Sequence, residues 1–177
     1  MFFSDLLKFN SFLAITLAWP ITCSAAEVSL PTGWRVPTQA ETSHNQEWRN
    51  RDKNRFLTIE ADFNGDGVPD RAMLLVRDKD STLGLFAFVS QASNVFKTYI
   101  LDEAIEKVRL DVMGITVSKP GKYTTACGKG YLDCREGEPE IIALQIAAVN
   151  YFKEGSANSF FYWDKVGRNF KRSWMSD

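Results

Sequence analysis

The sequence predicts a mainly β protein, built as a single antiparallel curved sheet or a small sandwich with one or two short helices. About eight short runs are rich in β-branched and aromatic residues, as strands are. Clusters of Gly, Pro, Asn and Asp separate these runs and read as turns. Residues 27–177 suffice for one domain with its own core and are too few for two ordinary ones.

Residues 1–26 have the layout of a cleaved secretory signal peptide. A weakly positive start is followed by an apolar stretch over 12–21, and Ser24-Ala25-Ala26 places small residues before Glu27. A bilayer-spanning helix needs about 20 apolar residues, so this stretch is too short to be one, and no later run reaches that length. We therefore expect a periplasmic or secreted protein without a membrane span.

A lipoprotein anchored on Cys23 is the alternative for this leader. Pro20-Ile21-Thr22 fits that alternative poorly, because lipoprotein signals usually carry leucine and small residues before the cysteine.

The first elements of the mature chain are short. Trp34–Val36 is a brief apolar piece that Pro37 ends. Thr38 is placed to cap a helix, with Glu41 three residues later, and the polar residues that follow predict a short helix ending near Trp48.

The middle of the chain predicts a series of strands and one short helix. The expected strands span 55–61, 71–78, 83–90 and 95–101. Asp102 can cap a helix of one or two turns in which Ala104, Ile105 and Val108 share a face. Residues 108–112 then alternate as a strand, and Gly114 marks a bulge.

The C-terminal part predicts a buried strand over 140–151 and two further strands over 156–163 and 169–174, joined by a hairpin turn at 164–168. Six aromatic residues gather here: Phe160, Phe161, Tyr162, Trp163, Phe170 and Trp174. Alternate residues of a strand face opposite sides, so half of this set can be core. A ligand-binding aromatic surface is the alternative interpretation.

The most specific motif is Asp-Phe-Asn-Gly-Asp-Gly-Val-Pro-Asp at 62–70, between two expected strands. It places side-chain oxygens at positions 1, 3, 5 and 9 and glycine at position 6, which is the spacing of a calcium-binding loop. An EF-hand is excluded, because position 12 is Met73 instead of Glu and the flanks do not read as helices. An Asx-rich turn without an ion is the alternative, although such a turn needs only one of the matching positions.

Over residues 56–76 this strand, loop and strand resemble the calcium loop of FG-GAP and VCBS-type repeats, found in integrin α-chain propellers and many secreted bacterial proteins. The resemblance implies a Ca²⁺ ion held by the side chains of Asp62, Asn64, Asp66 and Asp70, the carbonyl of Val68 and a water. No second copy of the loop occurs, so a closed propeller is not expected.

Once the leader is removed, two cysteines remain, and an even count in an oxidising compartment predicts a Cys127–Cys134 disulfide. Zinc binding and thiol redox chemistry are weaker alternatives. The chain has no second cysteine pair or nearby histidine for zinc, and the spacing is not Cys-x-x-Cys.

Composition and motifs indicate a protein that is not an enzyme. A net charge of −1 gives no electrostatic case for nucleic acid. His44, the single histidine, lies in a polar stretch, and Glu136 with Glu138 reads as an ordinary exposed acidic loop. We expect a calcium-binding module that binds a protein partner. A periplasmic immunity or inhibitor protein that neutralises a toxic hydrolase is the alternative, and the oligomeric state is not indicated.

Overall fold

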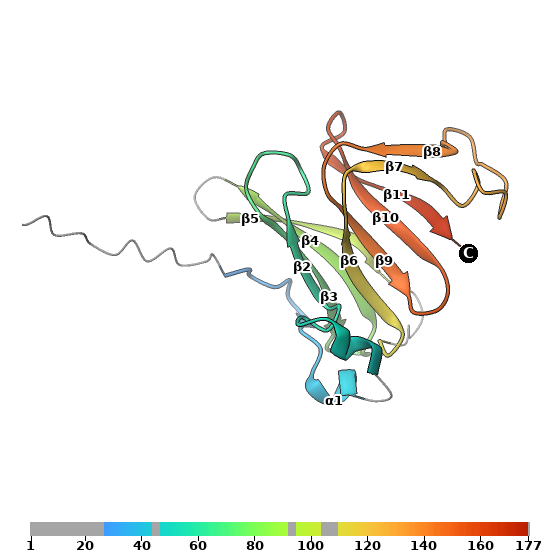
Figure 1. Cartoon of the computed structure of the whole chain (residues 1–177). Coiled ribbons are helices and arrows are strands. Elements are labelled where there is room, and N and C mark those ends of the chain that lie inside the picture. The colour runs from blue at the N-terminus through green and yellow to red at the C-terminus, as the bar shows by residue number, and fades with distance from the viewer. Residues whose placement is uncertain (1–26, 44–46, 92–94, 104–109, 177) are drawn as a thin grey trace, which may run out of the picture.

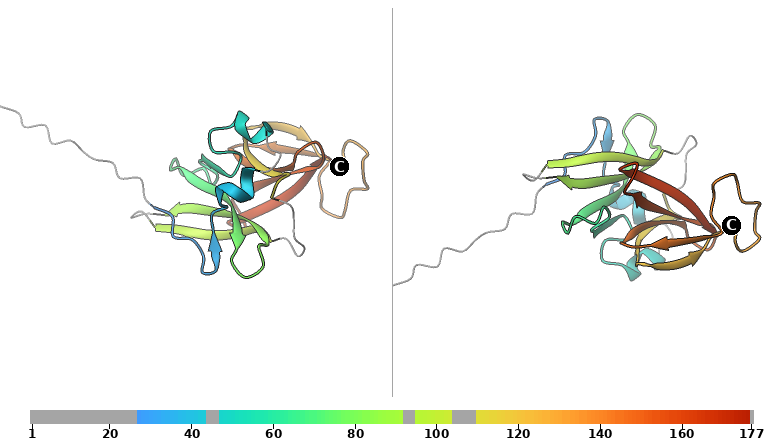
Figure 2. Two further views of the ribbon diagram at one scale, coloured as in Figure 1. Left: turned by 90° about the horizontal axis from the view of Figure 1, so that it is seen from below. Right: turned by 90° about the horizontal axis from the view of Figure 1, so that it is seen from above.

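The computed structural model describes residues 27–43, 47–91, 95–103 and 110–176 and confirms a mainly β, antiparallel fold. Two sheets form separate layers of a sandwich, and a third sheet of two strands covers part of one of them (Figures 1 and 2). The predicted signal peptide, His44 and the helix expected around Ala104, Ile105 and Val108 lie outside the described residues.

The first sheet comes from the N-terminal half of the described chain. Its strands are β1 (Trp34–Arg35), β2 (Thr58–Ala61), β3 (Asp70–Arg77), β4 (Leu83–Gln91) and β5 (Val95–Glu103). The strand order is β1-β3-β4-β5. β2 pairs with the first half of β3, while β1 pairs with its last two residues. β5 is therefore a free edge.

The second sheet comes from the C-terminal half. Its strands are β6 (Met113–Ser118), β9 (Ala148–Lys153), β10 (Asn158–Asp164) and β11 (Asn169–Ser176), in the order β11-β10-β9-β6. β7 (Gly121–Thr124) and β8 (Ile141–Leu144) form the small third sheet. The predicted hairpin turn at 164–168 is confirmed, because Asp164 pairs with Asn169.

Apolar side chains fill three layers. The largest cluster lies between the two main sheets and consists of Phe63, Ala72, Leu74, Val76, Leu83, Leu85, Ile115, Val149, Tyr151 and Phe161. A second lies under the small sheet: Ile142, Leu144, Ala148, Phe160 and Met175. A third lies on the outer face of the first sheet, where the N-terminal segment covers Leu75, Phe86 and Phe88. The core interpretation of Phe160 and Phe161 is thus confirmed.

The sandwich differs at its two sides. On one side, the Ile115 N–H donates to the Phe56 carbonyl at 2.9 Å and ties β6 to the residues just before β2. On the other side lie the edge strands β5 and β11, where the Tyr99 ring packs edge-on against Trp163 and Phe170. Among the described residues, the Tyr99 hydroxyl also donates to the Arg168 carbonyl at 3.3 Å, and Arg172 Nη1 lies 3.5 Å from Asp102 Oδ2, so side-chain contacts join this second side.

Two short helical elements are described in the region of the predicted helix. α1 covers Gln39–Ser43, and a 3-10 turn, η1, covers Glu47–Arg51. The predicted capping box is present: the Glu41 N–H donates to Thr38 Oγ1, and the Thr38 N–H donates to the Glu41 carboxylate at 2.7 Å. The Arg35 guanidinium also binds this carboxylate and lowers the pKa of Glu41 to about 2.

Arg49 explains why η1 is fixed in place. Its side chain is fully buried and donates to the carbonyls of Arg55, Leu110 and Met113, which joins three chain segments. Burial lowers the pKa of this guanidinium to about 10, so it remains charged at neutral pH.

Three details of the sequence-based prediction are wrong. Asp102 belongs to β5, and residues 110–112 form a turn, so the strand starts at Met113. Gly114 is not a bulge, because β6 pairs with β9 without a register shift. The glycine makes room for an aromatic ring instead, since a Cβ there would lie 2.5 Å from Phe152 Cζ.

Residues 140–151 are also not one strand. They contain β8 and the start of β9. β8 pairs with β7, a strand that the sequence did not predict.

Candidate functional site

The predicted calcium loop connects β2 to β3 at the end of the sandwich where the β10–β11 turn also lies (Figure 1). Phe63, the second loop residue, is fully buried in the core between the sheets, while Val68 is 46% exposed. The loop is therefore anchored at its start and open to solvent at its tip.

Asp62 organises the loop. Its Oδ1 accepts the N–H groups of Gly65 at 2.6 Å and Asp66 at 3.2 Å, and its Oδ2 accepts the N–H of Gly67 at 2.9 Å. Gly65 and Gly67 have φ of 81° and 85°, a conformation that glycine adopts without steric cost. One carboxylate and two glycines therefore wind this part of the chain tightly.

Asn64 and Asp66 face each other across the loop tip. The Asp66 N–H donates to Asn64 Oδ1 at 2.9 Å, and Asn64 Nδ2 donates to Asp66 Oδ2 at 2.8 Å. The Val68 N–H donates to Asp66 Oδ1 at 2.8 Å. Three of the predicted ligands, Asp62, Asn64 and Asp66, are thus joined in one hydrogen-bonded network.

Asp70 is placed differently from the other predicted ligands. Its side chain is 1% exposed, with Oδ2 accepting the Phe63 N–H at 2.9 Å and Oδ1 accepting the Ser90 N–H at 2.8 Å. Burial raises the pKa of Asp70 and outweighs these two hydrogen bonds, and the negative charges of Asp66 and Asp62 raise it further. This carboxylate fastens the start of the loop to β4.

Within the described ranges, no group of three or more His, Cys, Asp or Glu residues is gathered closely enough to hold a metal ion. The donor chemistry of the loop nevertheless fits calcium, which prefers carboxylate, amide and carbonyl oxygens. A carboxylate oxygen can accept two hydrogen bonds. Asp62 Oδ1 accepts two, whereas Asp62 Oδ2 and both oxygens of Asp66 and Asp70 each accept one.

The second sheet contacts the loop through two side chains. A Cβ placed on Gly65 would lie 3.4 Å from Ile146 Cγ2 and 3.7 Å from Lys165 Nζ. The Lys165 ammonium, from the β10–β11 turn, therefore lies beside the acidic loop. Sequence reasoning missed this residue, because the pairing depends on how the two sheets pack.

The predicted disulfide is confirmed, with Cys127 and Cys134 Cα atoms 4.9 Å apart. The chain around it is fastened to β11 and β8. The Ala126 N–H donates to the Trp174 carbonyl at 2.8 Å, and Lys129 Nζ donates to the Met175 carbonyl at 2.7 Å. At the base of the loop a Cβ on Gly128 would lie 2.2 Å from the Glu140 carbonyl oxygen, so only glycine fits there.

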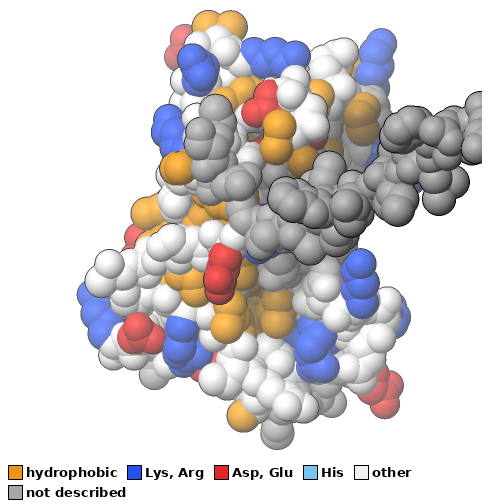
Figure 3. Space-filling model, turned by 90° about the vertical axis from the view of Figure 1, so that its left-hand side faces the viewer, with side chains coloured by type: hydrophobic (Ala, Val, Ile, Leu, Met, Phe, Trp, Pro, Cys, Tyr) orange, Lys and Arg blue, Asp and Glu red, His pale blue; other side chains and the backbone are white. Residues whose placement is uncertain are grey.

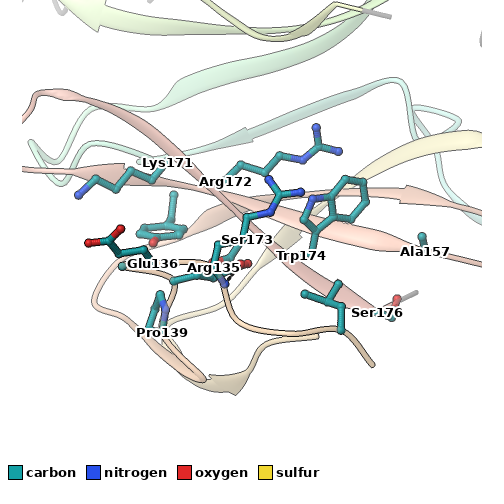
Figure 4. Close-up of a pocket in the computed structure, with 13 residues that line it drawn as sticks. Arg135, Glu136, Pro139, Ala157, Lys171, Arg172, Ser173, Trp174 and Ser176 are labelled. Carbon is teal, nitrogen blue, oxygen red and sulfur yellow. Dashed lines mark hydrogen bonds between the residues drawn. The ribbon is translucent and has the colours of Figure 1, made fainter. Parts of the chain in front are cut away.

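A groove of about 710 Å³ separates this cystine loop from β11 (Figure 4). The residues that give it chemical character are Arg135, Pro139, Tyr162, Lys171, Arg172 and Trp174. In Figure 4 the Arg135 side chain extends from the loop toward Trp174 on the strand. The groove was not predicted, although the sequence showed the aromatic residues that form its strand side.

The basic side chains of the groove are partly neutralised. Lys171 Nζ lies 2.8 Å from Asp164 Oδ2 and lowers the pKa of that carboxyl. The Arg172 guanidinium lies over the Trp174 ring, 4.1 Å from its centroid, and its Nη1 is 3.5 Å from Asp102 Oδ2. None of the ion pairs formed between described residues includes Arg135.

Glu136 and Glu138 belong to the loop side of this groove, and the Glu138 carboxylate accepts the Arg135 N–H at 3.4 Å.

Elsewhere, acidic, basic and hydrophobic side chains are interspersed over the face shown in Figure 3. No helix among the described residues combines the length and apolar character needed to cross a bilayer.

No protein-family model, curated protein or solved structure matches this chain.

Proposed function

We propose that this chain is a non-enzymatic, calcium-stabilised binding domain that works in the periplasm or outside the cell. The observation that carries the proposal is the turn around Asp62, whose carboxylate accepts three successive backbone N–H groups. That turn sets Asp62, Asn64 and Asp66 at alternate positions around one loop, where a calcium ion would use their remaining lone pairs. The Val68 carbonyl and Asp70 complete the proposed ligand set.

Two features support the proposed location. A cystine is typical of oxidising compartments, and Cys127 and Cys134 are bonded. The pattern of residues 1–26 is that of a secretory leader. Mass measurement of the purified protein tests this proposal: we expect a chain that begins at Glu27, whereas a lipid-modified mass that retains Cys23 would reject it.

Calcium binding is tested by thermal unfolding of the purified protein with free calcium or with chelator. A ligand that binds only the folded state, at ten times its Kd, stabilises it by about 1.4 kcal/mol. For a domain of this size the melting temperature should rise by about 3–6 °C. We expect a Kd on the order of 10⁻⁴ to 10⁻³ M, as in extracellular calcium modules, and a smaller effect of magnesium.

Asp66→Ala should abolish the calcium response, because it removes the carboxylate at the centre of the loop network. Asp133→Ala is the matched control, since it removes an exposed carboxylate from the cystine loop. Equal melting temperatures of the unmodified protein in calcium and in chelator would reject calcium binding. The loop would then be a turn held only by its own hydrogen bonds.

The second candidate function, an inhibitor or immunity protein for a toxic hydrolase, is favoured by the groove of charged and aromatic side chains beside the outer edge of β11. Such a protein needs a rigid surface for one enzyme and no catalytic residues of its own. It is tested by an affinity pull-down from periplasmic extract, followed by adding equimolar purified protein to a hydrolase that the pull-down retains. Unchanged hydrolase activity would reject this candidate.

A further inference from the structure

The outer edge of β11 is paired only in part among the described residues. β11 is the outermost strand of its sheet, and the Trp174 carbonyl accepts the Ala126 N–H, so the backbone of Trp174 points away from β10. In an antiparallel strand the N–H and C=O of every second residue point to the same side. The backbone groups of Arg172 therefore also point toward the groove.

The opposite wall of the groove is fixed before any ligand arrives. Most of this wall is residues 135–139, which follow the disulfide-bonded Cys134 directly, and the Thr125 hydroxyl donates to the Pro139 carbonyl at 2.9 Å at the other end of the segment. A preformed wall lowers the ordering cost of binding. The space between this wall and β11, about 710 Å³, suits an extended peptide segment.

The charges of the groove select the type of segment. Three cations, Arg135, Lys171 and Arg172, and two carboxylates, Glu136 and Glu138, line the groove. Lys171 and Arg172 form ion pairs with Asp164 and Asp102, so Arg135, which has no carboxylate partner among the described residues, is the cation left for a ligand. Pairing β11 with β11 of a second copy around Arg172 would bring these cations together, which is unfavourable. An acidic strand would meet them favourably.

We propose that this groove binds an extended acidic segment of a partner protein, which adds a strand to the edge of β11. Lys171 and Arg172 point to opposite faces of the sheet, so two successive acidic residues of the added strand would face one each. The following residue would lie opposite Ser173, and the one after it would lie against the half-exposed Trp174 and should be apolar. This inference rests on the proposed binding function and does not depend on calcium.

The test is a titration of ¹⁵N-labelled protein with the acetylated, amidated hexapeptide Val-Thr-Glu-Glu-Thr-Val, which places a valine opposite Trp174. We expect saturable shifts of the Arg172 amide and of the Trp174 indole N–H, and slower hydrogen exchange of the Arg172 amide because it gains an acceptor. The peptide with both glutamates changed to glutamine should bind about tenfold more weakly, because charge-assisted hydrogen bonds are lost. A backbone N-methylated peptide should not bind.

Arg135→Gln should weaken binding of the glutamate peptide about tenfold without affecting folding, because Arg135 is exposed. Lys153→Gln, which removes an exposed cation from β9, is the matched control and should bind as the unmodified protein does. Three outcomes would overturn the proposal: no saturable shifts at millimolar peptide, equal affinity for the glutamine peptide, or a dimer in sedimentation that buries β11. Thermal unfolding tests calcium binding by the loop, whereas the peptide titration tests binding in the groove. Failure of one proposal can therefore be distinguished from failure of the other.

Discussion

The two closed loops of this protein are held by different chemistry. Residues 127–134 are closed by a covalent bond, and the chain beside them is held against β11 by the Ala126–Trp174 backbone hydrogen bond. Residues 62–70 are closed by carboxylates that accept backbone N–H groups, with Asp70 at the buried end. The first closure is insensitive to ions, whereas the second concentrates negative charge in a small space. The second loop is therefore the one for which we propose calcium binding.

Breaking the covalent closure should have the largest effect. Cys134→Ser releases an eight-residue loop, and the chain-entropy treatment gives a loss of about 2–3 kcal/mol in unfolding free energy. Urea denaturation measures this loss, and reductant should produce a similar loss in the unmodified protein. The calcium response should persist, since the two loops close independently. Its disappearance would show that the loops are coupled.

Asp70→Asn should weaken the second closure by a smaller amount. An amide oxygen can accept a hydrogen bond, but the amide NH₂ cannot, so one of the buried N–H groups of Phe63 and Ser90 loses its acceptor. The cost of such an unsatisfied group is about 1–3 kcal/mol. Denaturation gives the magnitude, and faster hydrogen exchange of the Phe63 or Ser90 amide locates it. Exchange that changes only elsewhere would contradict this role of Asp70.

Lys165→Gln should have the smallest effect of the three substitutions, and it should strengthen calcium binding. The ammonium lies beside Gly65 and opposes a divalent ion in the loop. Removing it should tighten calcium binding by about two- to fivefold, because an exposed charge pair contributes about 1 kcal/mol or less. Calorimetry measures the change, with Lys153→Gln as the control for net charge. Equal calcium affinities of the Lys165→Gln and Lys153→Gln variants would show that the Lys165 charge does not affect the loop.

Local patterns in the sequence predicted most strands, the capping box at Thr38 and the disulfide, because each depends on residues near one another in the chain. The errors arose where a distant side chain decided the structure. The Phe152 ring accounts for Gly114, and the direction of Asp70 depends on the Ser90 N–H of another strand. The groove could not be predicted, because its walls meet only after the cystine loop folds back over β11.

The two main sheets are built from consecutive parts of the chain, the first from strands that end at Glu103 and the second from strands that begin at Met113. During synthesis the N-terminal half appears first, so all strands of the first sheet are made before any strand of the second. Until then the apolar inner face of that sheet, including Leu74 and Leu85, lacks its cover. Exposed apolar sheet surface promotes aggregation, so the stage between completion of the first sheet and formation of the second is the vulnerable stage of folding for this protein.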